Sequence, residues 1–193
     1  MEELRMVFSM EKVKIKHQLI NKSLYNTDDF YFISCKNFWD GGFETSASLE
    51  EKYSFYKLAN KFSNIIKEIL IELKDDVIIG KTISEKSYIF EKWSDINRYD
   101  AFMNLTENIN KHSHYLINIK NDGNIIDYIV ENNFRYLTCI DLYLLNNKII
   151  IQPTCHSEVI IYAENYTKII PIVQNILKNY NDVYCFQNKT QNK

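Results

Sequence analysis

The sequence predicts an α+β fold, with a mainly antiparallel sheet on which several helices pack. Short apolar segments follow one another between residues 134 and 163, joined by turns of the kind that connect antiparallel strands. One long amphipathic pattern, over residues 49–73, predicts a helix that covers the sheet. Strands and helices do not alternate regularly, as a parallel sheet would require. No linker rich in Pro, Gly or Ser divides the chain, so we expect one α+β domain over residues 1–187 and a disordered tail over residues 188–193.

The centre of the predicted sheet lies in the second half of the chain. Its first strand, Phe134–Leu145, is apolar at nearly every position, which indicates a central strand covered on both faces. The turn Asn146-Asn147 leads to a second strand, Lys148–Gln152, and a third strand spans Glu158–Ala163. A helix from about Thr167 to Tyr180 follows, with an apolar stripe at helical spacing.

Two charged residues interrupt the apolar first strand. Arg135 and Asp141 are six positions apart, so strand alternation would place them on the same face of the sheet. A charged group on a covered strand must reach a sheet edge, a partner or a site.

A capping box predicts where the longest helix begins. Ser48 fits the N-cap position, and Glu51 is placed to return a hydrogen bond to the Ser48 amide. The helix continues to about Leu73, after which Val77–Ile79 begins a strand that Gly80 is expected to end. One wide apolar face runs along this helix: Phe55, Leu58, Ala59, Phe62, Ile65, Ile66, Ile69, Leu70 and Leu73.

The N-terminal segment fits two periods. A stripe from Met6 to Leu24 recurs at spacings of three and four, which predicts a helix, whereas Lys12–His17 alternates in the manner of a half-buried strand. We favour the helix because its pattern is longer. Phe30–Cys35 follows as a short apolar strand.

Shorter patterns predict the remaining elements. Arg98–Ile109 has the spacing of a helix, and Tyr115–Lys120 alternates as a strand. A helix over Asn124–Glu131 is expected to end at Asn132-Asn133, because Asn tolerates the left-handed conformation at a helix C-terminus. Val183–Phe186 is predicted to close the sheet as an edge strand.

Composition and charge exclude several classes of protein. The formal net charge is −2, the isoelectric point is near 6.1, and Arg5, Arg98 and Arg135 are the only arginines. Such a chain has no overall positive field for a phosphate backbone, so we expect no nucleic-acid partner. No uninterrupted apolar run reaches the roughly 20 residues that a membrane-spanning helix needs, and the acidic start Met1-Glu2-Glu3 is unlike a secretory signal. We therefore expect a cytoplasmic protein without a membrane partner.

The cysteines and histidines form no recognisable cofactor motif. The four cysteines are widely spaced and include no Cys-x-x-Cys pair, so we expect neither a zinc site nor another cofactor. His112 and His114 are two residues apart, and on an extended segment they would project to the same face. This pair is an alternative metal site, although no third ligand follows at a recognisable spacing.

One segment raises the possibility of a hydrolase. Cys155, His156 and Glu158 are close in sequence, and a thiolate nucleophile needs a base and an orienting carboxylate. His112 or His114 could join them from a neighbouring strand. However, Cys155 and His156 would point to opposite faces of an extended chain, so we favour a polar hairpin connection over a catalytic site.

A non-enzymatic protein-binding module is the favoured hypothesis, with a structural or regulatory oligomer as a further alternative. Exposed tryptophans are common interface anchors, and acidic residues would complement a basic partner. A small, slightly acidic cytosolic protein from an AT-biased bacterial gene fits the profile of an immunity protein or antitoxin that neutralises a toxin domain by direct binding. The candidate binding residues are Trp39, Asp40, Glu50, Glu51, Asp75, Asp76 and Trp93.

Overall fold

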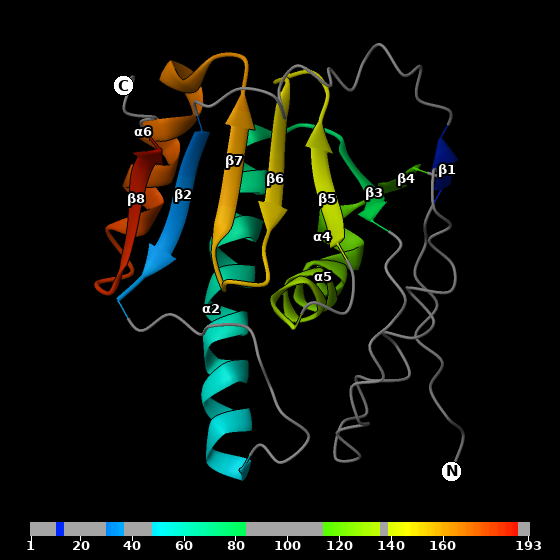
Figure 1. The fold of residues 1–193 in the computed structure, drawn as a ribbon. Helices are drawn as coiled ribbons and strands as arrows, with labels where there is room; N and C mark the ends of the chain where they lie inside the picture. Colours follow the sequence, from blue (N-terminus) through cyan, green and yellow to red (C-terminus); the bar gives the residue numbers. More distant parts are fainter. Residues whose placement is uncertain (1–10, 14–29, 37–47, 84–113, 136–138, 189–193) are drawn as a thin grey trace.

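The computed structural model describes residues 11–13, 30–36, 48–83, 114–135 and 139–188 (Figure 1). The strands in these ranges are β1 (Glu11–Val13), β2 (Phe30–Cys35), β3 (Val77–Ile83), β4 (His114–Ile117), β5 (Cys139–Leu144), β6 (Ile149–Pro153), β7 (Val159–Ala163) and β8 (Val183–Asn188). The helices are α2 (Leu49–Leu73), α4 (Ile119–Asp122), α5 (Asn124–Phe134) and α6 (Tyr166–Leu177).

The described strands form one eight-stranded sheet in the order β1-β4-β3-β5-β6-β7-β2-β8. Every pair of neighbouring strands is antiparallel. The predicted α+β fold with a mainly antiparallel sheet is therefore confirmed. Among the described helices, none combines the length and the apolar character that a membrane-spanning helix requires.

The three longer helices cover one face of the sheet. Figure 1 shows α2 crossing behind the central strands. Ile79 in β3 and Leu142 in β5 belong to the same buried cluster as Phe62 of α2, Ile129 of α5 and Val173 of α6. Because strand residues alternate between faces, the sheet contributes alternate residues to this core: Val77, Ile79, Ile140, Leu142, Leu144, Ile149, Ile151, Val159, Ile161 and Ala163.

A second, smaller cluster lies on the opposite face of the sheet. It consists of Ile78, Tyr143, Ile150 and Tyr162, all buried. β5 has a neighbouring strand on each side and is buried on both faces. The prediction of a central strand covered on both faces is thus confirmed for β5.

The start and the end of helix α2 are both set by residues next to them in the sequence. The Ser48 amide donates to Glu51 Oε2 at 2.7 Å, and the Glu51 amide donates to Ser48 Oγ at 3.2 Å. This capping box satisfies two amides that the first turn would otherwise leave unpaired. Helix α2 ends at Leu73, because Lys74 adopts the left-handed conformation with φ 50°. The predicted bounds of this helix are confirmed.

The predicted start of the central strand is wrong. Phe134 is the last residue of α5, and β5 begins only at Cys139. Asn133 does not end the helix; it is buried, and its side chain donates to the Ile140 and Pro153 carbonyls at 2.9 Å each. The Ile140 amide donates back to Asn133 Oδ1 at 3.1 Å. Because the Asn133 side chain is used in these tertiary hydrogen bonds, α5 continues through Asn132-Asn133 to Phe134.

Two further element boundaries differ from the prediction. Strand β3 continues through Gly80 to Ile83. A Cβ at Gly80 would lie 2.6 Å from His114 Cδ2, so the glycine makes room for a side chain of the neighbouring strand instead of ending its own. Strand β4 ends at Ile117, because the Asn118 side chain accepts a hydrogen bond from the Lys120 amide and caps α4.

The N-terminal prediction is wrong where the structure describes it. Glu11–Val13 forms β1, which pairs with β4, so sheet pairing overrides the helical period in this stretch. The predicted edge strand at Val183 is confirmed as β8, although it extends to Asn188, the first residue of the predicted tail. The predicted helix over residues 98–109 lies outside the described residues.

Candidate functional site

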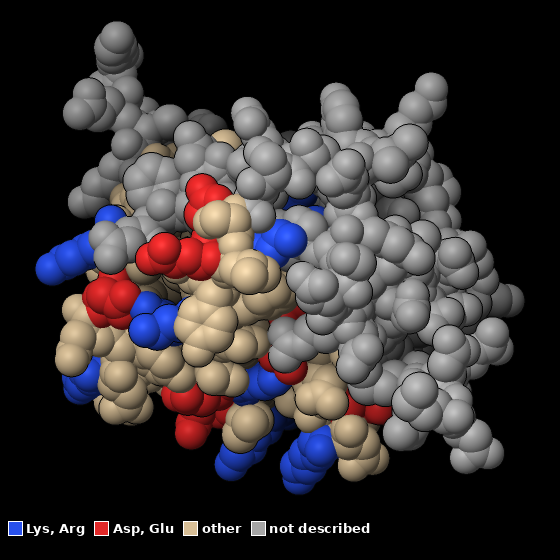
Figure 2. All heavy atoms as spheres, turned by 90° about the horizontal axis from the view of Figure 1, so that it is seen from below, with Lys and Arg blue, Asp and Glu red and all other residues tan. Residues whose placement is uncertain are grey.

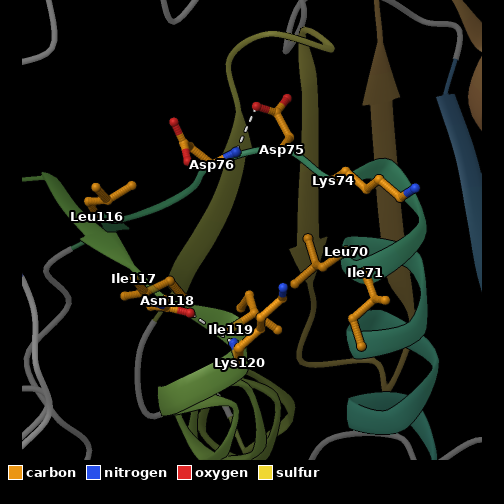
Figure 3. A pocket seen from close by; sticks show the side chains of 10 residues that line it. All are labelled: Leu70, Ile71, Lys74, Asp75, Asp76, Leu116, Ile117, Asn118, Ile119 and Lys120. Atoms are coloured by element: carbon orange, nitrogen blue, oxygen red, sulfur yellow. Dashed lines mark hydrogen bonds between the residues drawn. The ribbon is translucent and has the colours of Figure 1, made fainter.

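An open hollow lies where the C-terminal end of α2 approaches β4 and α4 (Figure 3). Its volume is about 790 Å³, within the range of about 300 to 1,000 Å³ that is usual for ligand pockets. The hollow is lined by Leu70, Ile71, Lys74, Asp75, Asp76, Leu116, Ile117, Asn118, Ile119 and Lys120.

The abrupt end of α2 forms one wall of the hollow. The Lys74 amide donates to the Leu70 carbonyl at 3.2 Å, and the left-handed conformation of Lys74 turns the chain toward β3. Asp75 is fixed in this turn, because its Oδ2 accepts from the Asn147 amide at 2.8 Å and its Oδ1 from Asn146 Nδ2 at 2.7 Å. The carboxylate of Asp75 therefore holds the β5–β6 turn against the end of α2.

The junction of β4 and α4 forms the facing wall. Asn118 Oδ1 accepts from the Lys120 amide at 3.0 Å, and the Asn118 carbonyl accepts from the Asp122 amide at 2.7 Å. Figure 3 shows the Lys120 side chain directed from α4 toward Leu70, across the hollow. Asp76 lies on the opposite rim, in the link between α2 and β3.

The hollow has an apolar base and a rim of both charges. Leu70 and Ile117 are buried at its base, while Ile71 is 58% exposed. Lys74, Asp76 and Lys120 are all exposed around it. An apolar centre within a polar rim is the usual composition of a protein interface.

The four predicted acidic residues that the structure describes do not form one patch. Glu50 and Glu51 lie in the first turn of α2, whereas Asp75 and Asp76 follow its last residue. A helix of 25 residues separates the two pairs by roughly 37 Å at 1.5 Å per residue. Hydrogen bonds from the Ser48 backbone and side chain lower the pKa of Glu51, so its carboxylate serves the cap. Figure 2 shows acidic and basic side chains interspersed over the described part of the face seen from below.

The proposed hydrolase residues lie together in the β6–β7 connection. The Thr154 amide donates to the Glu158 carbonyl at 2.8 Å, and Ser157 has φ 56°, so Cys155 and His156 occupy a tight hairpin turn. His156 is exposed and Cys155 is half-buried. Their role in catalysis stays a prediction.

Of the remaining predicted metal-binding and partner-binding residues, the structure describes only His114. His114 lies in β4, with its ring centroid 5.6 Å from that of Tyr143. Among the described residues, no group of three His, Cys, Asp or Glu side chains could hold a metal ion. Trp39, Asp40, Trp93 and His112 lie outside the described residues.

A buried polar cluster occupies the face of the sheet away from the helices. Asp141 is fully buried; its Oδ1 accepts from Gln152 Nε2 at 2.9 Å, and Tyr143 Oη donates to its Oδ2 at 3.5 Å. Burial raises the pKa of Tyr162, and the nearby charge of Asp141 raises it further. The prediction that Arg135 and Asp141 share one face of the same strand is wrong, because Arg135 is the C-cap residue of α5.

Sequence reasoning did not identify the hollow or this cluster. The hollow joins residues about 45 positions apart in the chain, and strand pairing between β3 and β4 brings them together. For the buried cluster, the sequence offered one indication: Asp141 is a charged residue within an apolar strand.

Comparison with protein-family models, curated protein sequences and solved structures finds no match. The geometry described above is therefore the basis for a functional proposal.

Proposed function

We propose that this protein is a non-enzymatic protein-binding module that docks a partner at the hollow beside the C-terminal end of α2. The observation that supports the proposal is Ile71, which is 58% exposed next to buried Leu70. Docking an apolar side chain of a partner on Ile71 would remove the apolar surface of both side chains from water. This burial favours binding by about 25 cal/mol for each Å². In protein interfaces a few well-packed residues that lose contact with water on binding supply most of the binding energy.

The charged rim would orient the partner. Lys74 and Lys120 lie on the rim together with Asp76, so a complementary surface would carry charges of both signs around its apolar centre. Asp75 contributes indirectly, since its hydrogen bonds to Asn146 and Asn147 fix the turn beside the hollow. We assign Asp76 a direct contact and Asp75 a positioning role.

The narrower form of the proposal is an immunity protein or antitoxin whose partner is a toxin domain. This form rests on the size, charge and composition of the sequence. Co-expression tests it directly: the protein should restore growth of cells that produce the captured partner. If the captured partner is harmless to cells, the antitoxin form is wrong while the docking proposal stands.

Affinity capture with matched variants tests the docking proposal. Ile71→Asp places a charge among the apolar side chains that line the hollow and should lower recovery of a stoichiometric partner at least about tenfold. Leu49→Asp is the control, because Leu49 is 76% exposed on the same helix and does not line the hollow. Circular dichroism should confirm that both variants are folded. Equal recovery by wild type and Ile71→Asp would contradict the proposal.

A further inference from the structure

Strand β8 is an edge strand in the described sheet. It pairs with β2 over six residues, from Phe30↔Asn188 to Cys35↔Val183, without a register shift. Figure 1 shows β8 at the end of the sheet, beside β2. In an antiparallel pair, only half of the backbone N–H and C=O groups of an edge strand point toward its neighbour. The other half of β8 points outward.

The residues of β8 carry none of three features that commonly prevent strands from pairing between molecules. Edge strands are commonly protected by charged side chains, proline or a bulge. The segment Val183–Asn188 contains no charged residue and no proline, and its register with β2 is regular. The sequence of β8 is therefore compatible with pairing to a further strand.

Two exposed aromatic side chains extend along the same edge. Val183 and Cys185 pack toward the helices, so Tyr184 and Phe186 lie on the opposite face. They are 44% and 40% exposed. Phe186 stacks on Phe32 with ring centroids 5.0 Å apart, and the Tyr184 and Phe186 centroids are 5.7 Å apart. An aromatic stripe thus reaches the open side of the sheet.

We propose that two copies of this chain pair through β8, antiparallel and in register about a two-fold axis at Cys185. An uncharged strand meets its own copy without like-charge repulsion, which a two-fold interface requires because both sides are the same patch. The two sheets would form one continuous sheet, with the helices of both copies on the same face. Tyr184 and Phe186 would become buried where the two sheets meet, which favours pairing.

The aromatic positions select this register. With Cys185 opposite Cys185 of the second copy, Tyr184 lies opposite Phe186 of the second copy, and Phe186 opposite its Tyr184. A shift by two residues would leave one aromatic residue opposite Asp182 or Asn188. In the chosen register, Asp182 lies opposite uncharged Asn188, and it already forms an ion pair with Lys61. Only this register places aromatic side chains opposite one another at both positions.

Sedimentation equilibrium of designed variants tests the pairing and its register. The double variant Tyr184→Lys with Phe186→Lys places like charges opposite one another and should weaken dimerisation at least about tenfold. The variant Tyr184→Lys with Phe186→Glu places opposite charges at the same contacts and should dimerise at least about tenfold more tightly than the double lysine variant. Tyr53→Lys, at a 76% exposed aromatic position in α2, should dimerise like the wild type.

The possible results separate the alternatives. A wild-type protein that is monomeric at all concentrations overturns the proposal. The proposal is also overturned if the double lysine variant dimerises as tightly as the wild type. The same holds if the variant Tyr184→Lys with Phe186→Glu dimerises no more tightly than the double lysine variant. If the wild type is monomeric and the β8 variants lose a different protein, the edge binds a heterologous strand and the self-pairing proposal is wrong. None of these variants changes the hollow, so the outcome is independent of the proposed function.

Discussion

The side chain of Asn133 joins one helix to two strands. It is buried at the end of α5 and forms hydrogen bonds with both backbone groups of Ile140 in β5 and with the Pro153 carbonyl in β6. The amide donates two hydrogen bonds and accepts a third, whereas an ionised carboxylate can only accept and a hydroxyl can donate only one. This single residue therefore fixes the end of α5 against the start of β5 and the end of β6.

Asn133→Ala should destabilise the protein. It removes three hydrogen bonds and leaves buried backbone groups without partners, so we expect the free energy of unfolding to fall by about 3 kcal/mol. Urea denaturation followed by circular dichroism measures the change. Asn175→Ala, at an exposed position of α6, should change stability by no more than about 0.5 kcal/mol. A loss below about 1 kcal/mol in Asn133→Ala would contradict this role.

Elements with local signals were predictable from the sequence, and elements set by tertiary contacts were not. The capping box of Ser48 and Glu51 predicts the start of α2, because both hydrogen bonds lie within one turn. The boundaries near Gly80 and Asn133 were wrong, since Gly80 accommodates His114 of β4 and Asn133 bonds to Pro153 of β6, and both partners are distant in sequence. The hollow could not be predicted for the same reason: Asp75 and Asp76 were candidates, but Ile71 was not, because it lies outside the apolar face predicted for this helix.

A hydrogen bond between elements also makes stability depend on pH. Tyr180, which follows α6, donates to Glu68 Oε1 of α2 at 2.7 Å. Burial, together with this hydrogen bond and the charge of Glu68, raises the pKa of Tyr180 to about 12. The unfolded chain loses the same proton near pH 10. Protonated Tyr180 therefore stabilises the folded protein fully below about pH 10, and this contribution to the free energy of unfolding is lost as the pH rises toward about 12.

Tyr180→Phe should show this dependence. The variant lacks the hydroxyl, so it should be less stable than the wild type by about 1 kcal/mol near pH 8. Between about pH 8 and about pH 11 the difference should shrink, because only the wild type has the titrating group. Urea denaturation at both pH values measures it, with Tyr53→Phe at an exposed position of α2 as the control. A difference that stays constant with pH would show that Tyr180 is not the titrating group.

In the whole molecule, the two proposed surfaces are well separated. The hollow lies at β4 and the pairing edge at β8, with five strands between them. Six strand spacings of about 4.8 Å correspond to roughly 29 Å. A pair of copies joined through β8 would therefore keep both hollows accessible at the outer ends of the combined sheet.

Hydrogen exchange should distinguish the centre of this sheet from its edge. Amides of β5 and β6 have strands on both sides, so they should exchange by global unfolding, whereas β8 should exchange by local opening. Pairing with a second copy would add hydrogen bonds to β8. We therefore expect exchange at β8 to slow as protein concentration rises, while exchange at β5 stays constant. The variant with lysine at positions 184 and 186 should lose the concentration dependence, and a wild type without it would contradict the pairing.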